Sequence, residues 1–230
     1  MLSESVMLIL SDEQLSAEFS ARTCFRSYLV TRTHGSFLQR QGAVCGRVSL
    51  LKCGIVKLLY SQMPGAEAVI GLRSNGCIIG PAFGGVSPSS AVCVSECKIW
   101  QIPLEQWRSV ISNDFELLQS VHRYLLKEWA AAATLMALMN SRTATARVLA
   151  FLSELAETEV AGHKTSREGR WPVAEWEVAQ LLGITPSHFS RILGKLKRMG
   201  VIVRQREGIG IVKLDVLAAL ADDPANELAS

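Results

Sequence analysis

The 230-residue sequence contains no apolar run that approaches the roughly 20 residues needed to span a bilayer. Histidine is also scarce, and of the four present only His34 falls in the part of the chain where short strands are expected. A metal-dependent barrel enzyme needs several converging histidines and a carboxylate, and a serine or cysteine hydrolase needs a histidine base. The sequence therefore predicts neither an enzyme nor a metal site.

Closely spaced cysteine pairs are missing as well. The six cysteines include no C-x-x-C pair, and Cys93 and Cys97 are four positions apart. The N-terminal stretch lacks the basic flank of a signal peptide and runs at once into acidic residues, which predicts a cytoplasmic protein with mostly reduced thiols. We expect no cofactor and no contact with a membrane.

What the chain does contain is a globular composition, with 49% hydrophobic and 20% charged residues. Its net charge of +3 is too small to identify a partner, but the charge is unevenly distributed. Seven lysines or arginines lie between Ser187 and Lys213, against one acid, Glu207. A basic segment of this kind can bind phosphates.

The strongest local pattern lies between Val173 and Met199, where two helices are expected on either side of a tight turn. Gly183 ends the first helix, Thr185 caps the second, and Pro186 occupies its first position, where the missing N–H costs nothing. The apolar positions expected to be buried are Val173, Trp176, Ala179, Leu181, Leu182, Phe189, Ile192, Leu193 and Leu196.

The opposite face of the second helix is polar, small or basic, which suits a helix in the major groove of DNA. A hairpin-like segment, VIVRQREGIGIVKL, follows, with Gly208 and Gly210 expected in its turn. An ordinary helical hairpin with a solvated charged face is the alternative. The short turn, the basic excess and the following hairpin favour a winged helix–turn–helix that binds double-stranded DNA.

Residues 25–102 have a different texture, with short apolar runs separated by glycines. Such runs predict the strands of a small antiparallel barrel or sandwich. The expected strands are Tyr28–Val30, Val44–Leu51, Ile55–Tyr60, Ala68–Leu72, Cys77–Ile79, Ala91–Val94 and Lys98–Ile102.

A long helix is expected from Asn113 or Asp114 to Met139, followed by a hinge at Asn140–Ser141. It carries two apolar stripes, one of which contains His122, Trp129 and Met136. A helix with two apolar faces needs two packing partners, which we expect to be the barrel and a second copy of the chain, although a single-chain core helix is the alternative. The expected dimer contacts are Leu118, Val121, Leu125, Ala132, Leu135 and Met139.

This order of segments resembles the Crp–Fnr family of transcription regulators. The segment LGITPSHFSRILGKLKRMGVI, Leu182–Ile202, is similar to the family's recognition helix, and Leu50–Gly80 is similar to its barrel core. The resemblance implies an α+β fold with an N-terminal β-roll or jelly-roll barrel, a homodimer and RNA polymerase as a further partner. The expected domains are an effector-type β-roll domain over 1–112, a long dimerisation helix over 113–139, and a winged helix–turn–helix DNA-binding domain over 140–230.

The effector segment departs from the pattern of the cyclic-nucleotide-binding members. No arginine lies between Arg73 and Arg108, and Ser89-Ser90 stands where those members have an arginine next to a serine or threonine. A buried cyclic phosphate without an arginine would be poorly compensated, so we expect no binding of cAMP or cGMP. The residues of the candidate pocket, whose ligand is unknown, are Gly80, Phe83, Ser89 and Ser90.

The cysteines leave several alternatives open. Only Cys24 lies in the N-terminal stretch, so an iron–sulfur cluster of the family type is not expected. Cys77 and His122 are conceivable haem ligands, but a small buried cysteine and an ordinary histidine are the simpler interpretation. A redox switch through Cys93 or Cys97, or through Cys45 with Cys53, remains open because thiol reactivity depends on local environment.

The recognition helix carries the expected DNA contacts. Ser187 stands where the family commonly has a glutamate, which changes the expected half-site, and Arg191 is expected to bond guanine in a bidentate manner. The predicted base contacts are Ser187, His188, Ser190 and Arg191, and the predicted phosphate contacts are Thr185, Lys195, Arg198, Arg204 and Arg206. The sequence thus predicts a homodimeric regulator sensing a signal other than cAMP. The alternatives are a regulator controlled by its abundance and a redox or haem sensor using barrel cysteines.

Overall fold

The computed structural model describes residues 9–21, 28–63, 65, 67–141, 143–157, 159–160, 163–164, 174–205 and 208–222. The chain divides into two compact units. Residues 10–130 form one, and residues 131–230 with the first nine residues form the other, so the boundary falls within the long helix. The α+β architecture expected from the sequence is confirmed.

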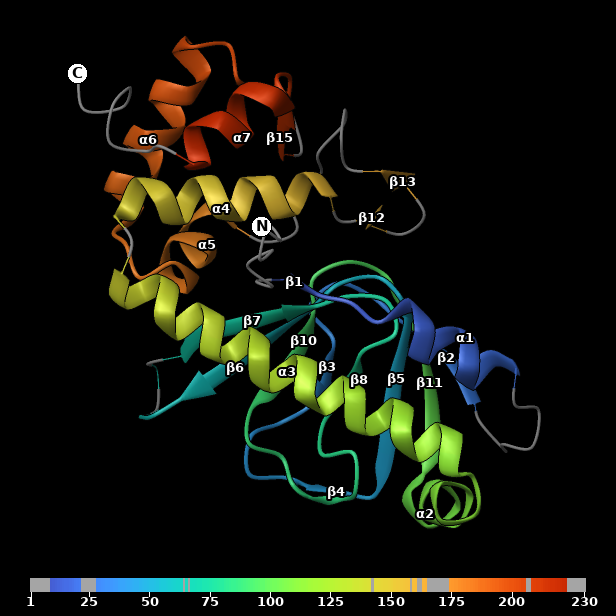
Figure 1. The fold of residues 1–230 in the computed structure, drawn as a ribbon. Helices are drawn as coiled ribbons and strands as arrows, with labels where there is room; N and C mark the ends of the chain where they lie inside the picture. The colour runs from blue at the N-terminus through green and yellow to red at the C-terminus, as the bar shows by residue number, and fades with distance from the viewer. Residues whose placement is uncertain are drawn as a thin grey trace. The chain divides into compact units, whose positions relative to one another are not determined.

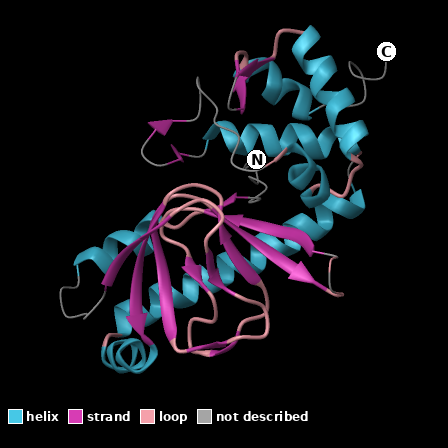
Figure 2. Ribbon diagram, turned by 180° about the vertical axis from the view of Figure 1, so that it is seen from behind, coloured by secondary structure: helices cyan, strands magenta, loops and turns pink. Residues whose placement is uncertain are grey.

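The strands of the first unit form two sheets and a short two-stranded ribbon (Figure 1, Figure 2). The pairings among β2 to β11 are antiparallel, and Ile99 lies opposite both Val30 and Leu51. The five-stranded sheet has the order β1 (Ile9–Leu10), β7 (Glu67–Arg73), β6 (Val56–Ser61), β10 (Ser90–Cys93) and β3 (Phe37–Gln39). The four-stranded sheet has the order β2 (Tyr28–Arg32), β11 (Cys97–Pro103), β5 (Arg47–Cys53) and β8 (Ile78–Ile79). The ribbon pairs β4 (Val44–Cys45) with β9 (Gly85–Val86).

The core of this unit has apolar side chains on both sides of β5. Four successive residues of β5 are buried, as expected for a strand covered on both faces. Phe19 of α1 (Glu13–Ala21) lies near two tryptophans, with ring centroids 6.3 Å from Trp100 and 6.5 Å from Trp107 of α2 (Leu104–Asn113). Six of the seven expected strands are found. The expected strand Val44–Leu51 is instead divided at Gly46 into β4 and β5, which lie in different sheets. The strands β1, β3 and β9 were not predicted because two or three residues leave little periodicity.

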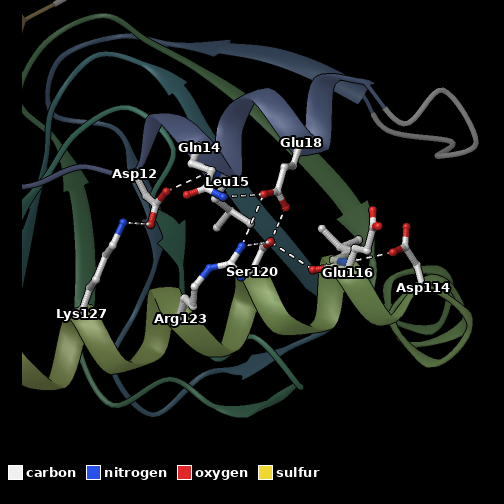
Figure 3. A network of polar contacts seen from close by, with 10 residues as sticks. Asp12, Gln14, Leu15, Glu18, Asp114, Glu116, Ser120, Arg123 and Lys127 are labelled. Atoms are coloured by element: carbon white, nitrogen blue, oxygen red, sulfur yellow. Dashed lines mark hydrogen bonds and ion pairs between the residues drawn. The ribbon is translucent and has the colours of Figure 1, made fainter.

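The long helix α3 (Phe115–Ser141) is tied to α1 by a network of polar contacts (Figure 3). Asp12 accepts a hydrogen bond from the backbone N–H of Leu15 at 2.9 Å, which caps α1, and its other oxygen lies 2.8 Å from Lys127 Nζ. Glu18 accepts a hydrogen bond from Ser120 and pairs with Arg123 at 3.4 Å. These contacts hold the N-terminal helix on the long helix.

Glu128 interrupts the apolar pattern of the long helix, and the structure gives the reason. Its carboxylate lies 2.8 Å from Arg73 Nε on β7 and 2.9 Å from the hydroxyl of Tyr124. Burial raises the pKa of Tyr124, so its hydroxyl stays protonated, and its one proton is shared between the Glu128 carboxylate and the carbonyl of Ile78. The charged pair therefore lies on the barrel-facing side of α3.

The second unit is mainly helical. The helix α3 runs to Ser141, so the expected hinge at Asn140–Ser141 lies within this helix. The next helix, α4 (Ala144–Glu157), is capped by Thr143, whose hydroxyl accepts from the backbone N–H of Ala146 at 3.2 Å. None of the described helices is long and apolar enough to cross a membrane. The remaining elements are β12 (Glu159–Val160), β13 (His163–Lys164), α5 (Glu175–Leu181), α6 (Pro186–Arg198), β14 (Ile202–Gln205), β15 (Gly208–Ile211) and α7 (Leu214–Asp222).

Candidate nucleic-acid interface

The turn between α5 and α6 follows the local signals in the sequence. Gly183 has φ +62°, a conformation that side chains with a Cβ rarely adopt. The hydroxyl of Thr185 accepts from the backbone N–H of His188 at 3.3 Å, and Pro186 is the first residue of α6. The predicted helix–turn–helix is therefore formed, with the expected cap at the start of its second helix.

The two faces of α6 are separated as the sequence predicts. Phe189, Ile192, Leu193 and Leu196 are buried. Three of the predicted base-contact residues, Ser187, Ser190 and Arg191, are exposed side by side on one helix, and His188 is half-buried. The exposed side is therefore the one whose hydroxyl and guanidinium groups can hydrogen-bond to base edges.

The predicted phosphate contacts are only partly described. Thr185 and Arg198 are exposed and Lys195 is half-buried, while the side chain of Arg204 and all of Arg206 lie outside the described residues. Lys195, Lys197 and Arg198 occupy the last turn of α6, where positive charge also complements the helix dipole.

Two details of this unit correct the sequence interpretation. The side chain of Trp176 was expected in the core but is 55% exposed on α5. Gly208 and Gly210 were expected in the turn of the wing, but both lie within β15, opposite Gln205 and Val203. Val173 lies outside the described residues.

Sequence reasoning also missed how α5 begins. The carboxylate of Glu177 accepts from the backbone N–H of Ala174 at 3.0 Å, and its side chain is buried. A glutamate at the third position of a helix is a known partner for the residue that precedes the helix. That spacing could have been recognised in the sequence.

The long helix α3 presents different residues to the protein and to solvent. Val121 was predicted as a dimer contact, but it is fully buried within the chain, together with Leu117 and Tyr124, and cannot contact a second copy. This corrects the expected interface. The other predicted contacts, Leu118, Leu125, Ala132, Leu135 and Met139, are half-buried or exposed.

The solvent side of α3 carries large apolar residues at heptad spacing. Phe115, Trp129 and Met136 are 70%, 71% and 67% exposed and lie, with His122, seven positions apart. A second row at the same spacing contains Leu118, Leu125, Ala132 and Met139. Two such rows, offset by three residues, have the spacing of a coiled-coil seam.

The candidate effector segment is held by bonds within the first unit. The hydroxyl of Ser90 accepts from the backbone N–H of Gln41 at 3.0 Å, and the carbonyl of Ser89 accepts from the hydroxyl of Ser87 at 2.7 Å. Gly80 has φ +94°, and Phe83 is partly exposed. The side chain of Ser90 and the main-chain carbonyl of Ser89 thus have partners within the first unit.

Among the described cysteines of the first unit, Cys45 and Cys53 are half-buried, whereas Cys77, Cys93 and Cys97 are buried. Cys77 is fully buried, its thiol donates to the carbonyl of Leu10, and burial raises its pKa to about 12. Cys93 and Cys97 are hydrogen-bonded to each other, which lowers the pKa of Cys97 to about 7 and raises that of Cys93. In the part of the chain that the structure describes, no three His, Cys, Asp or Glu side chains form a potential metal site.

Two family models match the chain at the two regions just described. A cyclic nucleotide-binding domain matches residues 30–114, and a Crp-like helix-turn-helix domain matches residues 146–220. The first match covers the barrel and α2, and the second covers α4 to α7. Neither match by itself identifies the ligand of the barrel.

Curated relatives and solved structures agree with this assignment. A Rhizobium leguminosarum bv. viciae protein named "Probable transcriptional activator" is 30% identical over 70% of this chain and 68% of its own length. The fumarate and nitrate reduction regulatory protein of Salmonella typhimurium is 25% identical over 84% of this chain and 78% of its own. The structure of FixK2 from Bradyrhizobium japonicum, at 18% identity, covers 84% of this chain and 96% of that one with a TM-score of 0.73.

An N-terminal barrel, a long helix and a C-terminal helix–turn–helix with an exposed basic face define a DNA-binding regulator. The chain belongs to the Crp–Fnr family of transcription regulators, as its sequence predicts. Members of this family regulate transcription and are not enzymes.

Proposed function

We propose that this chain is a homodimeric, sequence-specific DNA-binding regulator whose barrel responds to a signal other than cAMP. The observation that carries the DNA-reading role is the exposed row of Ser187, Ser190 and Arg191 on α6. A single recognition helix reads few base pairs, and pairing two of them doubles the site that is read. On the same helix, Lys195 and Arg198 supply positive charge that can bind the phosphates of DNA.

Support for the homodimer comes from the two heptad rows on the solvent side of α3. Phe115, Trp129 and Met136 would each remove a large apolar surface from water if a second α3 packed alongside. The proposed interface differs from the one expected from the sequence, because it leaves out the buried Val121 and includes the row of Phe115, His122, Trp129 and Met136. Leu118, Leu125 and Ala132 belong to it, as expected from the sequence.

Support for a signal other than cAMP comes from the charges available to the barrel. Arg73, whose side chain is 14% exposed, is already paired with Glu128. Recruiting it to a phosphate would leave that carboxylate half-buried without its partner. The hydroxyl of Ser90 already accepts from the backbone N–H of Gln41, and neither Ser89 nor Ser90 carries a positive charge.

The proposed mechanism is a shift between two populations of the dimer. A signal at the barrel would change the packing of α3 against its copy, and the altered seam would change the spacing of the two recognition helices. The Rhizobium relative is named a probable transcriptional activator. If this chain also activates transcription, RNA polymerase is its expected further partner. Such a regulator acts in the compartment that holds the DNA, so the expected cytoplasmic location belongs to this proposal.

A redox sensor is the second candidate, because the neighbouring thiol of Cys93 lowers the pKa of Cys97, although both side chains are buried. A thiol with a pKa near neutrality is partly ionised, and the thiolate is the form that reacts with oxidants. Thiol mapping by mass spectrometry after peroxide treatment tests this candidate. Control by abundance alone predicts DNA binding that no small molecule changes.

The decisive experiment is selection of operators from random double-stranded DNA by the purified protein, with and without small molecules from a cell extract. We expect a palindromic site with a guanine in each half, and an affinity that the extract alters. Enrichment of no sequence would overturn the DNA-reading role. If cAMP alone changed the affinity for DNA as the extract does, the proposal that the barrel responds to a signal other than cAMP would be overturned.

A further inference from the structure

Arg147, in the first turn of α4, lies between the ends of two other helices of the second unit. Its Nη1 donates to the carbonyl of Met139 in the last turn of α3 at 2.9 Å. Its Nη2 lies 3.4 Å from the carbonyl of Gly183, which follows α5. One guanidinium group therefore joins the end of the long helix to the turn of the helix–turn–helix.

The chemistry of the two acceptors suits an arginine. The last four carbonyls of a helix lack partners within that helix, and the negative end of the helix dipole attracts a cation. Met139 is among these residues of α3, and Gly183 stands two residues beyond the end of α5. The planar guanidinium group can bond both carbonyls at once, whereas a lysine ammonium is a single point of charge.

Gly183 itself lies close to the end of the long helix. A Cβ placed at Gly183 would be 3.0 Å from the sulfur of Met139, so the methionine side chain would have to move by a few tenths of an ångström. Together with its positive φ, this approach leaves little room for another residue. Gly183 and Met139 are thus close neighbours as well as being bridged by Arg147.

This turn leads directly into the recognition helix. Gly183 is two residues before Thr185, whose hydroxyl caps α6. Any shift of Gly183 relative to Met139 would move the start of α6, on which Ser187, Ser190 and Arg191 lie. Met139 also belongs to a heptad row of α3, so the link runs from the proposed dimer seam to the DNA-reading face.

We propose that Arg147 is a positioning residue that fixes the recognition helix relative to the end of α3, and so sets the spacing of half-sites that the dimer accepts. The inference rests on the proposed homodimeric function. It places rigidity at the junction where the sequence alone predicts a hinge. The buried Nε of Arg147 has no hydrogen-bond partner among the described residues, so the two Nη contacts hold the side chain.

The test uses the full chain and an operator selected from random DNA by the wild-type protein. Affinities are measured for that operator and for versions with one or two base pairs added to or removed from its centre. The variants are Arg147→Ala and Arg147→Lys. Arg108→Ala is the matched control, because Arg108 also donates to a main-chain carbonyl, that of Phe83 in the barrel.

We expect Arg147→Ala to lose about tenfold in affinity at the selected spacing, within the usual range of coupling between sites. Losses at other spacings and on unrelated DNA should be much smaller, so the profile of affinity against spacing flattens. Arg147→Lys should fall between the alanine variant and the wild type, and Arg108→Ala should keep the wild-type profile. If the alanine variant does not fold, the lysine variant decides by the same profile.

A profile as sharp as that of the wild type would overturn the proposal. An equal loss at every spacing and on unrelated DNA would also overturn it, because that is the signature of a general loss of structure. Failure of the wild-type protein to select any operator would instead remove the proposed function on which this inference rests.

Discussion

Lys127 Nζ lies 2.8 Å from a carboxylate oxygen of Asp12, whose side chain is only 4% exposed (Figure 3). The other oxygen of Asp12 caps α1, so one carboxylate serves both the start of the N-terminal helix and the long helix. The pair spans 115 positions in the sequence. Its loss should be felt in the stability of the first unit.

Lys127→Met should lower the free energy of unfolding by about 1–2 kcal/mol, less than for a fully buried pair because the lysine side chain is partly exposed. Removing only the lysine leaves a buried carboxylate without its charge partner. Urea unfolding followed by tryptophan fluorescence measures the change. Lys98→Met is the control on an exposed lysine of β11, and adding Asp12→Asn to Lys127→Met should recover part of the loss.

Arg191→Ala should weaken binding to the selected operator by about 1–3 kcal/mol, because one bidentate base contact is lost. Binding to unrelated DNA should change little. Arg198→Ala is the matched control on the same helix, and it should weaken binding to every sequence and reduce the salt slope by about one. Titrations at several salt concentrations separate the two effects, and normal specificity in Arg191→Ala would refute its role.

Trp129→Glu and Leu125→Glu should produce monomers, because each would place a charge in an apolar seam. Val121→Ala should behave differently, since Val121 is buried within the chain. It should cost about 2 kcal/mol of stability and leave the oligomeric state unchanged. Light scattering with size-exclusion chromatography and thermal unfolding measure both properties, and a monomer from Val121→Ala would return that residue to the interface.

Cys77 should resist alkylation in the folded protein at about pH 8, because burial raises the pKa of its thiol to about 12 and the thiol therefore stays protonated at pH 8. Its burial also denies access to the reagent. Partly exposed Cys45 is the comparison, and mass spectrometry of iodoacetamide-treated protein measures both sites. Rapid labelling of Cys77 before unfolding would contradict this expectation.

Much of the DNA-binding region could be predicted because its signals are local. Gly183, Thr185 and Pro186 act on the backbone within a few residues, and the buried face of α6 follows directly from the helical period. The same holds for the longer strands of the barrel. Trp176 shows the limit, because an apolar residue at a helical spacing can still point to solvent.

By itself, the sequence determined the order of the main elements, the buried and exposed faces of α6 and the family, since these depend on periodicity, capping residues and turn residues. Only the tertiary structure decided which side of α3 faces the barrel. That side carries Leu117, Val121 and Tyr124, whereas both heptad rows lie toward solvent, and it is set by partners distant in sequence, such as Arg73 for Glu128. It likewise revealed that Arg147 joins Met139 to Gly183, because a contact across three helices leaves no periodic trace in the chain.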